Sequence, residues 1–112
     1  LKKVKKLFDF DNLITGPHFN YKDALDYYSQ NSSINFLKDI KVKTLIIQAK
    51  DDPIIPTIST EKAMLIKNDY IKYLFVEYGG HVGFINSKEA SKNDLDIYWS
   101  ENRIVEFVKN SQ

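Results

Sequence analysis

Two short runs of apolar residues constrain the fold of this chain more than any other feature of its sequence. They cover residues 44–49 and 71–77, and both are rich in strand-favouring residues and nearly continuously apolar at their centres. A strand with one face in water alternates apolar and polar residues, whereas a parallel strand buried on both faces does not. The two runs therefore predict parallel strands that are buried on both faces.

The residues between the two runs predict a crossover helix. Pro53 and Pro56 mark a loop after the first strand, and Ser59 or Thr60 can cap a helix that continues to about Ile66. Strand, helix and strand in this order form a βαβ unit, whose crossover we expect to be right-handed. The predicted fold class is therefore α/β.

The segments on either side of this unit are predicted to be mainly helical. Before it, the patterns indicate the end of an amphipathic helix at residues 1–8, a loop at Gly16-Pro17, a helix at 21–30 and a helical turn at 34–40. After it come a turn at Gly79-Gly80, a polar loop at 87–93, and a final helix with the apolar stripe Ile97, Ile104, Val105 and Val108. We therefore divide one domain into a helical part, residues 1–40, which we assign partly to a lid, and a βαβ part with a terminal helix, residues 41–112.

Composition limits the kinds of partner and location. The balance of 16 basic against 15 acidic residues creates no field for nucleic acid or for an anionic membrane. The lysines among the first six residues lack the interleaved aromatic residues and arginines of a nucleic-acid site, so we interpret them as a solvated face. No apolar run approaches the roughly 20 residues of a transmembrane helix. The absence of cysteine excludes disulfides and thiolate sites, and it fits a cytoplasmic location.

The two predicted strands indicate that this sheet is incomplete. The chain starts at Leu1 and its only methionine is Met64, so we expect it to be a piece of a longer protein. Two parallel strands do not form a stable sheet alone, because such sheets need both faces covered and further strands alongside. We expect the preceding part of the same protein, or a second copy in a homo-oligomer, to cover the open sheet edge.

A carboxylate and a histidine follow the two predicted strands. Asp52 comes just after the first strand and His81 just after the second, at the carboxyl edge where open α/β sheets build their sites. Neighbouring strands lie roughly 5 Å apart, so the two loops can bring the side chains into hydrogen-bonding contact. An aspartate that accepts from Nδ1 of the ring leaves Nε2 free to take a proton from a nucleophile, which is half of a catalytic triad.

Five ordered motifs, spread along nearly the whole chain, resemble a known family. They are Phe8-Asp9-Phe10-Asp11, Ala24-Leu25-Asp26-Tyr27-Tyr28-Ser29, Ala49-Lys50-Asp51-Asp52-Pro53, Gly79-Gly80-His81-Val82-Gly83-Phe84 and Tyr98-Trp99. Together they resemble the C-terminal region of the α/β-hydrolases, in the branch of YheT-like predicted esterases. The resemblance implies the last two parallel strands of a hydrolase sheet with their crossover and terminal helices. It also implies a serine hydrolase that acts on small-molecule carboxylic esters without a cofactor.

The resemblance also implies roles for single residues. Asp52 corresponds to the triad acid, because the family's acid stands immediately before the position of Pro53, and His81 corresponds to the base. Asp51 is the competing acid, but a residue before proline is held extended, which favours Asp52 and leaves Asp51 as a solvated loop carboxylate. None of the eight serines lies in a Gly-x-Ser-x-Gly elbow, so we expect the nucleophile upstream and the chain alone to be inactive.

Other interpretations of the same residues stay open. A non-catalytic binding or assembly module could keep the hydrolase scaffold and lose its chemistry. A metal site at Asp51, Asp52 and His81 would need further ligands, which the sequence does not offer at a recognisable spacing, so we predict none. His18 follows a loop signal without a supporting motif, and we interpret it as a surface or packing residue.

Overall fold

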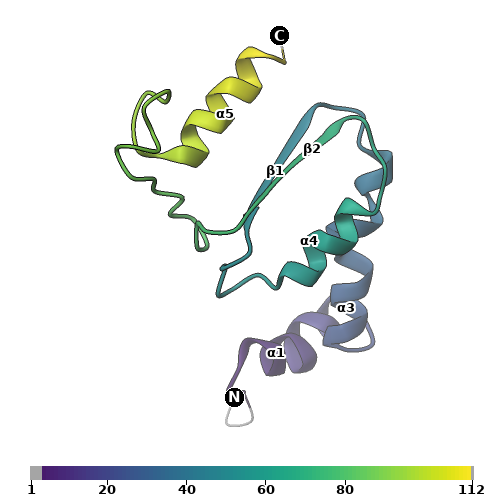
Figure 1. Cartoon of the computed structure of the whole chain (residues 1–112). Coiled ribbons are helices and arrows are strands. Elements are labelled where there is room, and N and C mark those ends of the chain that lie inside the picture. Colours follow the sequence, from purple (N-terminus) through teal and green to yellow (C-terminus); the bar gives the residue numbers. More distant parts are fainter. Residues whose placement is uncertain (1–3, 112) are drawn as a thin grey trace. The chain divides into compact units, whose positions relative to one another are not determined.

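The computed structural model describes residues 4–111, which form two compact units, and the chain divides between Phe36 and Leu37. The first unit is helical, and the second contains a two-stranded parallel sheet and helices (Figure 1). The α/β fold class predicted from the sequence is confirmed. None of the described helices is long and apolar enough to cross a membrane.

The first unit is a series of short helices. They are α1 (Leu7–Phe10), the π-helical turn η1 (Asp11–Thr15), α2 (Gly16–His18), α3 (Ala24–Asn31) and the 3-10 turn η2 (Ser33–Asn35). The loop predicted at Gly16-Pro17 is wrong, because proline is tolerated in the first turn of a helix, where its missing N–H is not needed. Gly16 is buried, and a Cβ there would lie 3.0 Å from the carbonyl oxygen of Asp11.

Two helices of this unit begin later than predicted. α3 begins at Ala24 rather than Tyr21, because the Asp23 carboxylate accepts a hydrogen bond from the N–H of Asp26 (2.9 Å) and caps the helix. α1 begins at Leu7. The amphipathic helix predicted at residues 1–8 is therefore wrong for residues 4–6, which are not helical. Its first three residues lie outside the described part of the chain.

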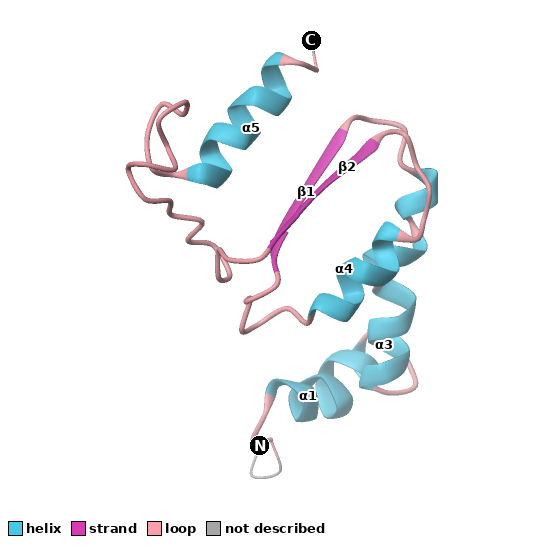
Figure 2. Cartoon of the chain, viewed as in Figure 1, coloured by secondary structure: helices cyan, strands magenta, loops and turns pink. Residues whose placement is uncertain are grey.

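The second unit contains the predicted βαβ order. Its elements are η3 (Leu37–Asp39), β1 (Thr44–Ala49), α4 (Thr57–Met64), β2 (Ile71–Val76) and α5 (Trp99–Lys109). The strands run parallel, and their register joins Thr44 to Ile71 and Ala49 to Val76. α4 and α5 lie on opposite faces of the sheet (Figure 2). Because the strands are parallel, their carboxyl ends lie together at one edge of the sheet.

The start of α4 differs from the prediction. The helix begins at Thr57 after Pro56, and neither Ser59 nor Thr60 caps it. Thr60 is buried, and its hydroxyl donates a hydrogen bond to Oε1 of Gln48 in β1. A threonine side chain that is turned toward the sheet cannot also satisfy the N–H groups at the start of its own helix.

Burial in the sheet is concentrated at the carboxyl end of β1. Gln48 and Ala49 are buried, whereas the other residues of β1 and all of β2 are at least partly exposed. The prediction of strands buried on both faces is therefore wrong for this structure. The physical reason is the small number of strands. Among the described residues β1 and β2 pair only with each other, so each strand has one edge without a neighbouring strand and its side chains stay partly exposed.

The apolar stripe predicted for the last helix is exposed for the same reason. Ile104, Val105 and Val108 lie on α5, and each has at least 40% of its surface exposed. Ile97 precedes the helix rather than belonging to it. α5 thus carries an apolar face that a two-stranded sheet does not cover.

Candidate active site

The candidate site lies where both strands end. The hydrogen-bond ladder continues past the strands, because the N–H of Lys50 donates to the carbonyl oxygen of Val76 (2.8 Å). The loops that follow β1 and β2 therefore leave the sheet as neighbours. This is the carboxyl edge at which open α/β sheets place their functional groups.

Asp52 and His81 lie in contact at this edge. Nδ1 of the imidazole is 3.0 Å from Oδ2 of the carboxylate. The Asp52 side chain is almost fully buried, with 4% of its surface exposed, whereas the His81 side chain is 42% exposed. The pair thus has a sheltered carboxylate and an imidazole that reaches the surface.

The loop around Asp52 folds back onto its carboxylate. Oδ1 accepts hydrogen bonds from the N–H groups of Ile54 (2.8 Å) and Ile55 (3.0 Å). These bonds hold the pKa of Asp52 below its ordinary value: the Ile55 N–H has the largest effect, His81 and Ile54 add to it, and burial opposes it. Asp52 is therefore ionised at neutral pH and acts only as an acceptor.

The Asp52 carboxylate next to Nδ1 determines the tautomer of His81. A carboxylate cannot donate a proton when ionised, so Nδ1 must carry the hydrogen of the 3.0 Å bond. Nε2 of the neutral ring then holds a free lone pair. This arrangement can accept a proton at Nε2 while Asp52 stabilises the cation that forms.

Glycines shape the turn before His81. Gly80 has a φ of +61°, a left-handed conformation that side chains disfavour. A Cβ on Gly79 would lie 2.4 Å from the ring of Phe84, because the turn closes with a hydrogen bond from the Phe84 N–H to the Gly79 carbonyl (3.0 Å). The sequence Gly-Gly before the histidine is therefore a requirement of the turn itself.

Asp51 has a structural role that the sequence analysis missed. Its Oδ1 accepts hydrogen bonds from the N–H groups of Gly79 (2.9 Å) and Gly80 (2.8 Å). Asp51 is exposed, as expected of a solvated loop carboxylate, and these two hydrogen bonds are an additional role. Its signal in the sequence is indirect: a glycine-rich turn leaves N–H groups in need of an acceptor, and Asp51 is the acidic neighbour of Asp52.

The buried side chains of Gln48 and Thr60 hold the loop that carries Asp52. Gln48 Nε2 donates to the carbonyl oxygen of Ile55 (3.0 Å), and the hydroxyl of Thr60 donates to Oε1 of the same glutamine. Both side chains are buried, so each bond is protected from water. Gln48 thus joins β1, α4 and the loop that carries Asp52 (residues 50–56, the acid loop). The sequence pattern did not indicate this role.

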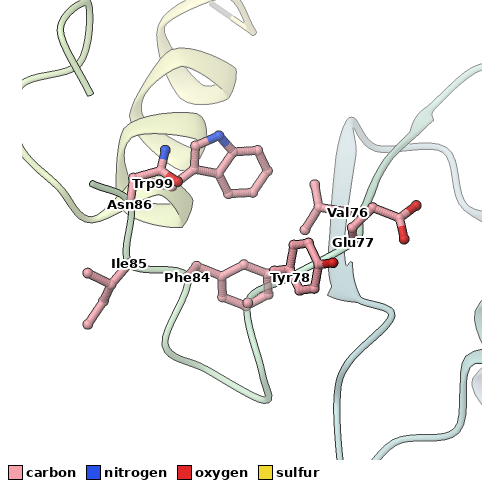
Figure 3. A pocket seen from close by; sticks show the side chains of 8 residues that line it. Val76, Glu77, Tyr78, Phe84, Ile85, Asn86 and Trp99 are labelled. Atoms are coloured by element: carbon pink, nitrogen blue, oxygen red, sulfur yellow. The ribbon is translucent and has the colours of Figure 1, made fainter. Parts of the chain in front are cut away.

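An open cavity of about 310 Å³ lies beside the segment that carries His81 (residues 77–84, the histidine loop) (Figure 3). Tyr78, Phe84, Ile85 and Trp99 are among its walls, and the rings of Phe84 and Trp99 stack with centroids 6.0 Å apart. His81 is not among the residues that line it. Gly79, two residues before His81, does line the cavity.

The remaining candidates give no second site. His18 is exposed in the first unit and meets the ring of Phe19 edge-on, at a centroid distance of 4.9 Å. Within residues 4–111, no group of three or more histidine, aspartate or glutamate side chains is gathered so as to hold a metal ion.

Comparison with known proteins gives relatives for nearly the whole chain. No family model and no solved structure matches it. The chain is 38% identical over 108 residues to the protein named "Putative esterase YheT" of Escherichia coli (strain K12). The aligned residues cover 96% of the chain and 30% of that protein. It is 32% identical over 109 residues to a monoacylglycerol lipase of Saccharomyces cerevisiae. That alignment covers 97% of the chain and 23% of the lipase.

A third relative has a related name. The chain is 31% identical over 106 residues to medium-chain fatty acid ethyl ester synthase/esterase 2 of Saccharomyces cerevisiae, which covers 95% of the chain and 22% of that protein. The chain thus spans less than a third of the length of these relatives, and it matches their C-terminal portions.

Proposed function

Because this chain belongs to the α/β-hydrolases and corresponds to their C-terminal region, we propose that the protein containing it hydrolyses carboxylic esters with a Ser-His-Asp triad. The observation that carries the proposal is the 3.0 Å contact between Asp52 and Nδ1 of His81 at the carboxyl ends of the strands. It leaves Nε2 available to a nucleophile. The names of the relatives, which include an esterase and a lipase, support the same reaction class.

The mechanism assigns one role to each residue. A serine from the part of the protein outside this chain attacks the ester carbonyl, and Nε2 of His81 takes the hydroxyl proton as the new C–O bond forms. His81 then gives that proton to the departing alcohol, which leaves an acyl-serine. A water molecule attacks the acyl-serine, its proton passes to His81 and then to serine, and the carboxylic acid is released. Asp52 orients the imidazole and stabilises its cationic form throughout.

The substrate class is a small-molecule carboxylic ester, and the reaction needs no cofactor. Ser-His-Asp chemistry uses only protein groups and water. The relatives named for monoacylglycerols and for fatty acid ethyl esters make acyl esters the class to test first.

The test is hydrolysis of p-nitrophenyl esters of several acyl lengths by the full-length protein and its variants. We expect Asp52→Asn to lower kcat by about 10⁴-fold, because the imidazole loses its correct tautomer, and His81→Ala by about 10⁶-fold, because it removes the base itself. His18→Ala is the matched control and should keep wild-type turnover, since that histidine lies exposed in the first unit.

Three outcomes would count against the proposal. Equal turnover in the wild type and both triad variants would remove His81 and Asp52 from the mechanism. Complete loss of activity in Asp51→Asn, with Asp52→Asn active, would move the acid to Asp51. A full-length protein without a Gly-x-Ser-x-Gly elbow and without turnover would favour a non-catalytic binding or assembly module instead.

A cytoplasmic location belongs to the same proposal. It is supported by the absence of cysteine from the chain, since proteins of a reducing compartment do not depend on disulfides. Cell fractionation with an antibody to the full-length protein tests it, and recovery in a membrane or secreted fraction would contradict it.

A further inference from the structure

We propose that Asp51 is a positioning residue, which holds the backbone of the histidine turn so that His81 meets Asp52. The inference rests on the proposed hydrolase function and deepens it. Three consecutive residues of the acid loop carry side chains that reach the histidine loop. Lys50 pairs with Glu77, Asp51 binds the N–H groups of the glycine turn, and Asp52 contacts His81.

The glycine turn is built to receive an anion. Successive backbone N–H groups in a turn that includes a left-handed residue point into one concavity, which attracts negative charge. Gly79 and Gly80 are such a pair, and Gly80 supplies the left-handed conformation with its φ of +61°. One oxygen of Asp51 accepts from both, at 2.9 and 2.8 Å. One side-chain oxygen therefore joins the two adjacent N–H groups of the turn to the loop that carries Asp52.

The His81 side chain depends on its backbone for its position. It is 42% exposed, so packing around the ring is incomplete, and within residues 4–111 the hydrogen bond of its side chain goes to Asp52. A single contact leaves the ring free to turn unless the main chain before it is held. Asp51 holds the two residues that directly precede His81. A misplacement of about 1 Å in a reacting group can cost about 10²-fold in rate.

The same geometry separates Asp51 from the triad acid. Oδ1 of Asp51 is occupied by two backbone donors, and the imidazole hydrogen bond goes to Oδ2 of Asp52. Asp51 therefore acts on the histidine through the main chain, whereas Asp52 acts on the ring. The two aspartates should respond differently to the same substitution.

The test compares Asp51→Ala and Asp51→Asn in the full-length protein, with Asp39→Ala as control. Asp39 is exposed in the η3 turn, which is hydrogen-bonded through the Leu37 carbonyl oxygen to Asn68 just before β2, at the opposite end of the strands from Asp51. Hydrolysis of a p-nitrophenyl ester gives kcat and KM. Proton NMR follows the downfield signal of the imidazole Nδ1–H that is hydrogen-bonded to Asp52, assigned by its loss in His81→Asn. Hydrogen exchange reports the Gly79 and Gly80 amides.

We expect Asp51→Ala to lower kcat by about 10- to 100-fold with little change in KM, and to weaken the Nδ1–H signal. Asp51→Asn should restore most of both, because its amide oxygen still accepts from the two glycines. Asp39→Ala should match the wild type. In the wild type and in Asp51→Asn, the Gly79 and Gly80 amides should exchange slowly.

Several results would overturn the proposal. One is an Asp51→Ala variant that matches Asp39→Ala in kcat and in the NMR signal. Another is an Asp51→Asn variant as inactive as Asp52→Asn, which would mean that the charge and not the turn matters. If Asp51→Ala does not fold, fast exchange of the Gly79 and Gly80 amides in the wild type would be decisive against it.

The readouts also separate this proposal from the proposed function. If the wild type hydrolyses no ester but Asp51→Ala still weakens the Nδ1–H signal, the hydrolase function fails and the positioning role stands. If the wild type hydrolyses esters and Asp51→Ala changes neither rate nor signal, the positioning role fails alone.

Discussion

Asp51 and Asp52 carry the same side chain but contact different parts of the histidine loop. Asp52 binds the imidazole of His81, and Asp51 binds the main chain at Gly79 and Gly80. A substitution at either position therefore reaches the same ring by a different route. The carboxylate of Asp52 also accepts two N–H groups of its own loop, which makes its charge a structural element as well as a proposed catalytic one.

The lowered pKa of Asp52 predicts how stability should depend on pH. A carboxyl group whose folded pKa lies below its ordinary value of 3.8 stabilises the folded state above that pH. This stabilisation is lost as the pH falls through the lower, folded value. We expect the full-length wild type to be more stable than Asp52→Asn at neutral pH, and the difference in unfolding free energy to shrink in acid below 3.8.

Urea unfolding of both proteins at a series of pH values measures this difference. Below the folded pKa, Asp52 is protonated and resembles asparagine in charge, so the two curves should converge. A difference that stays constant into acid, or that grows as the pH falls, would contradict the assignment of these hydrogen bonds.

At the scale of elements, the passage from β2 to the histidine turn depends on close packing around Gly79. A Cβ there would lie 2.4 and 2.5 Å from two ring atoms of Phe84 and 3.1 Å from the Cβ of Ala49. Phe84 is buried and stacked on Trp99, so a displaced ring would lose this packing. The end of β1, the turn and the start of α5 thus meet at one glycine.

We predict that Gly79→Ala destabilises the full-length protein by about 1–3 kcal/mol, the usual cost of overpacking. Gly83→Ala is the matched control, because its Cβ would meet only the Gly79 carbonyl oxygen at 3.3 Å. Chemical denaturation of both variants gives the comparison. Equal stability of the two alanine variants would show that the Phe84 ring can move aside.

The elements that sequence reasoning located correctly are those with a strong local pattern. β1 and β2 appear at their apolar runs, and the helix between them follows the prolines. The errors arose where a tertiary contact overrode local preference. Gly16-Pro17 looked like a loop but forms a helical turn in which the glycine permits close approach of backbone, and Thr60 looked like a cap but bonds Gln48.

The candidate site was predictable in part for a related reason. Strand ends and the Asp-Pro and Gly-His motifs are local features, so Asp52 and His81 could be paired from the sequence. The function of Asp51 and Gln48 depends on which backbone groups lack partners after folding. No pattern of residue types along the chain specifies that.

At the scale of the whole chain, the sheet is too small for the apolar residues that surround it. Among the described residues β1 and β2 pair only with each other, and α5 exposes Ile104, Val105 and Val108. Unpaired strand edges and uncovered apolar faces seek partners.

We therefore predict that the 112-residue chain, prepared alone, self-associates, whereas the full-length protein does so less. Light scattering coupled to gel filtration compares the two at equal concentration. A strictly monomeric and well-folded species of the short chain would contradict this prediction, and with it the homo-oligomer expected through the open sheet edge.

The contacts of Lys50, Asp51 and Asp52 have a consequence for how this loop can vary. Each of the three side chains meets a different partner on the histidine loop, in the same order along both segments. Replacing one of them removes its own contact and keeps the spacing of the other two along the loop. Inserting a single residue directly after Ala49 would shift all three at once. The length of this loop should therefore tolerate less change than its composition, which makes loop length the quantity to preserve in any engineered or grafted version.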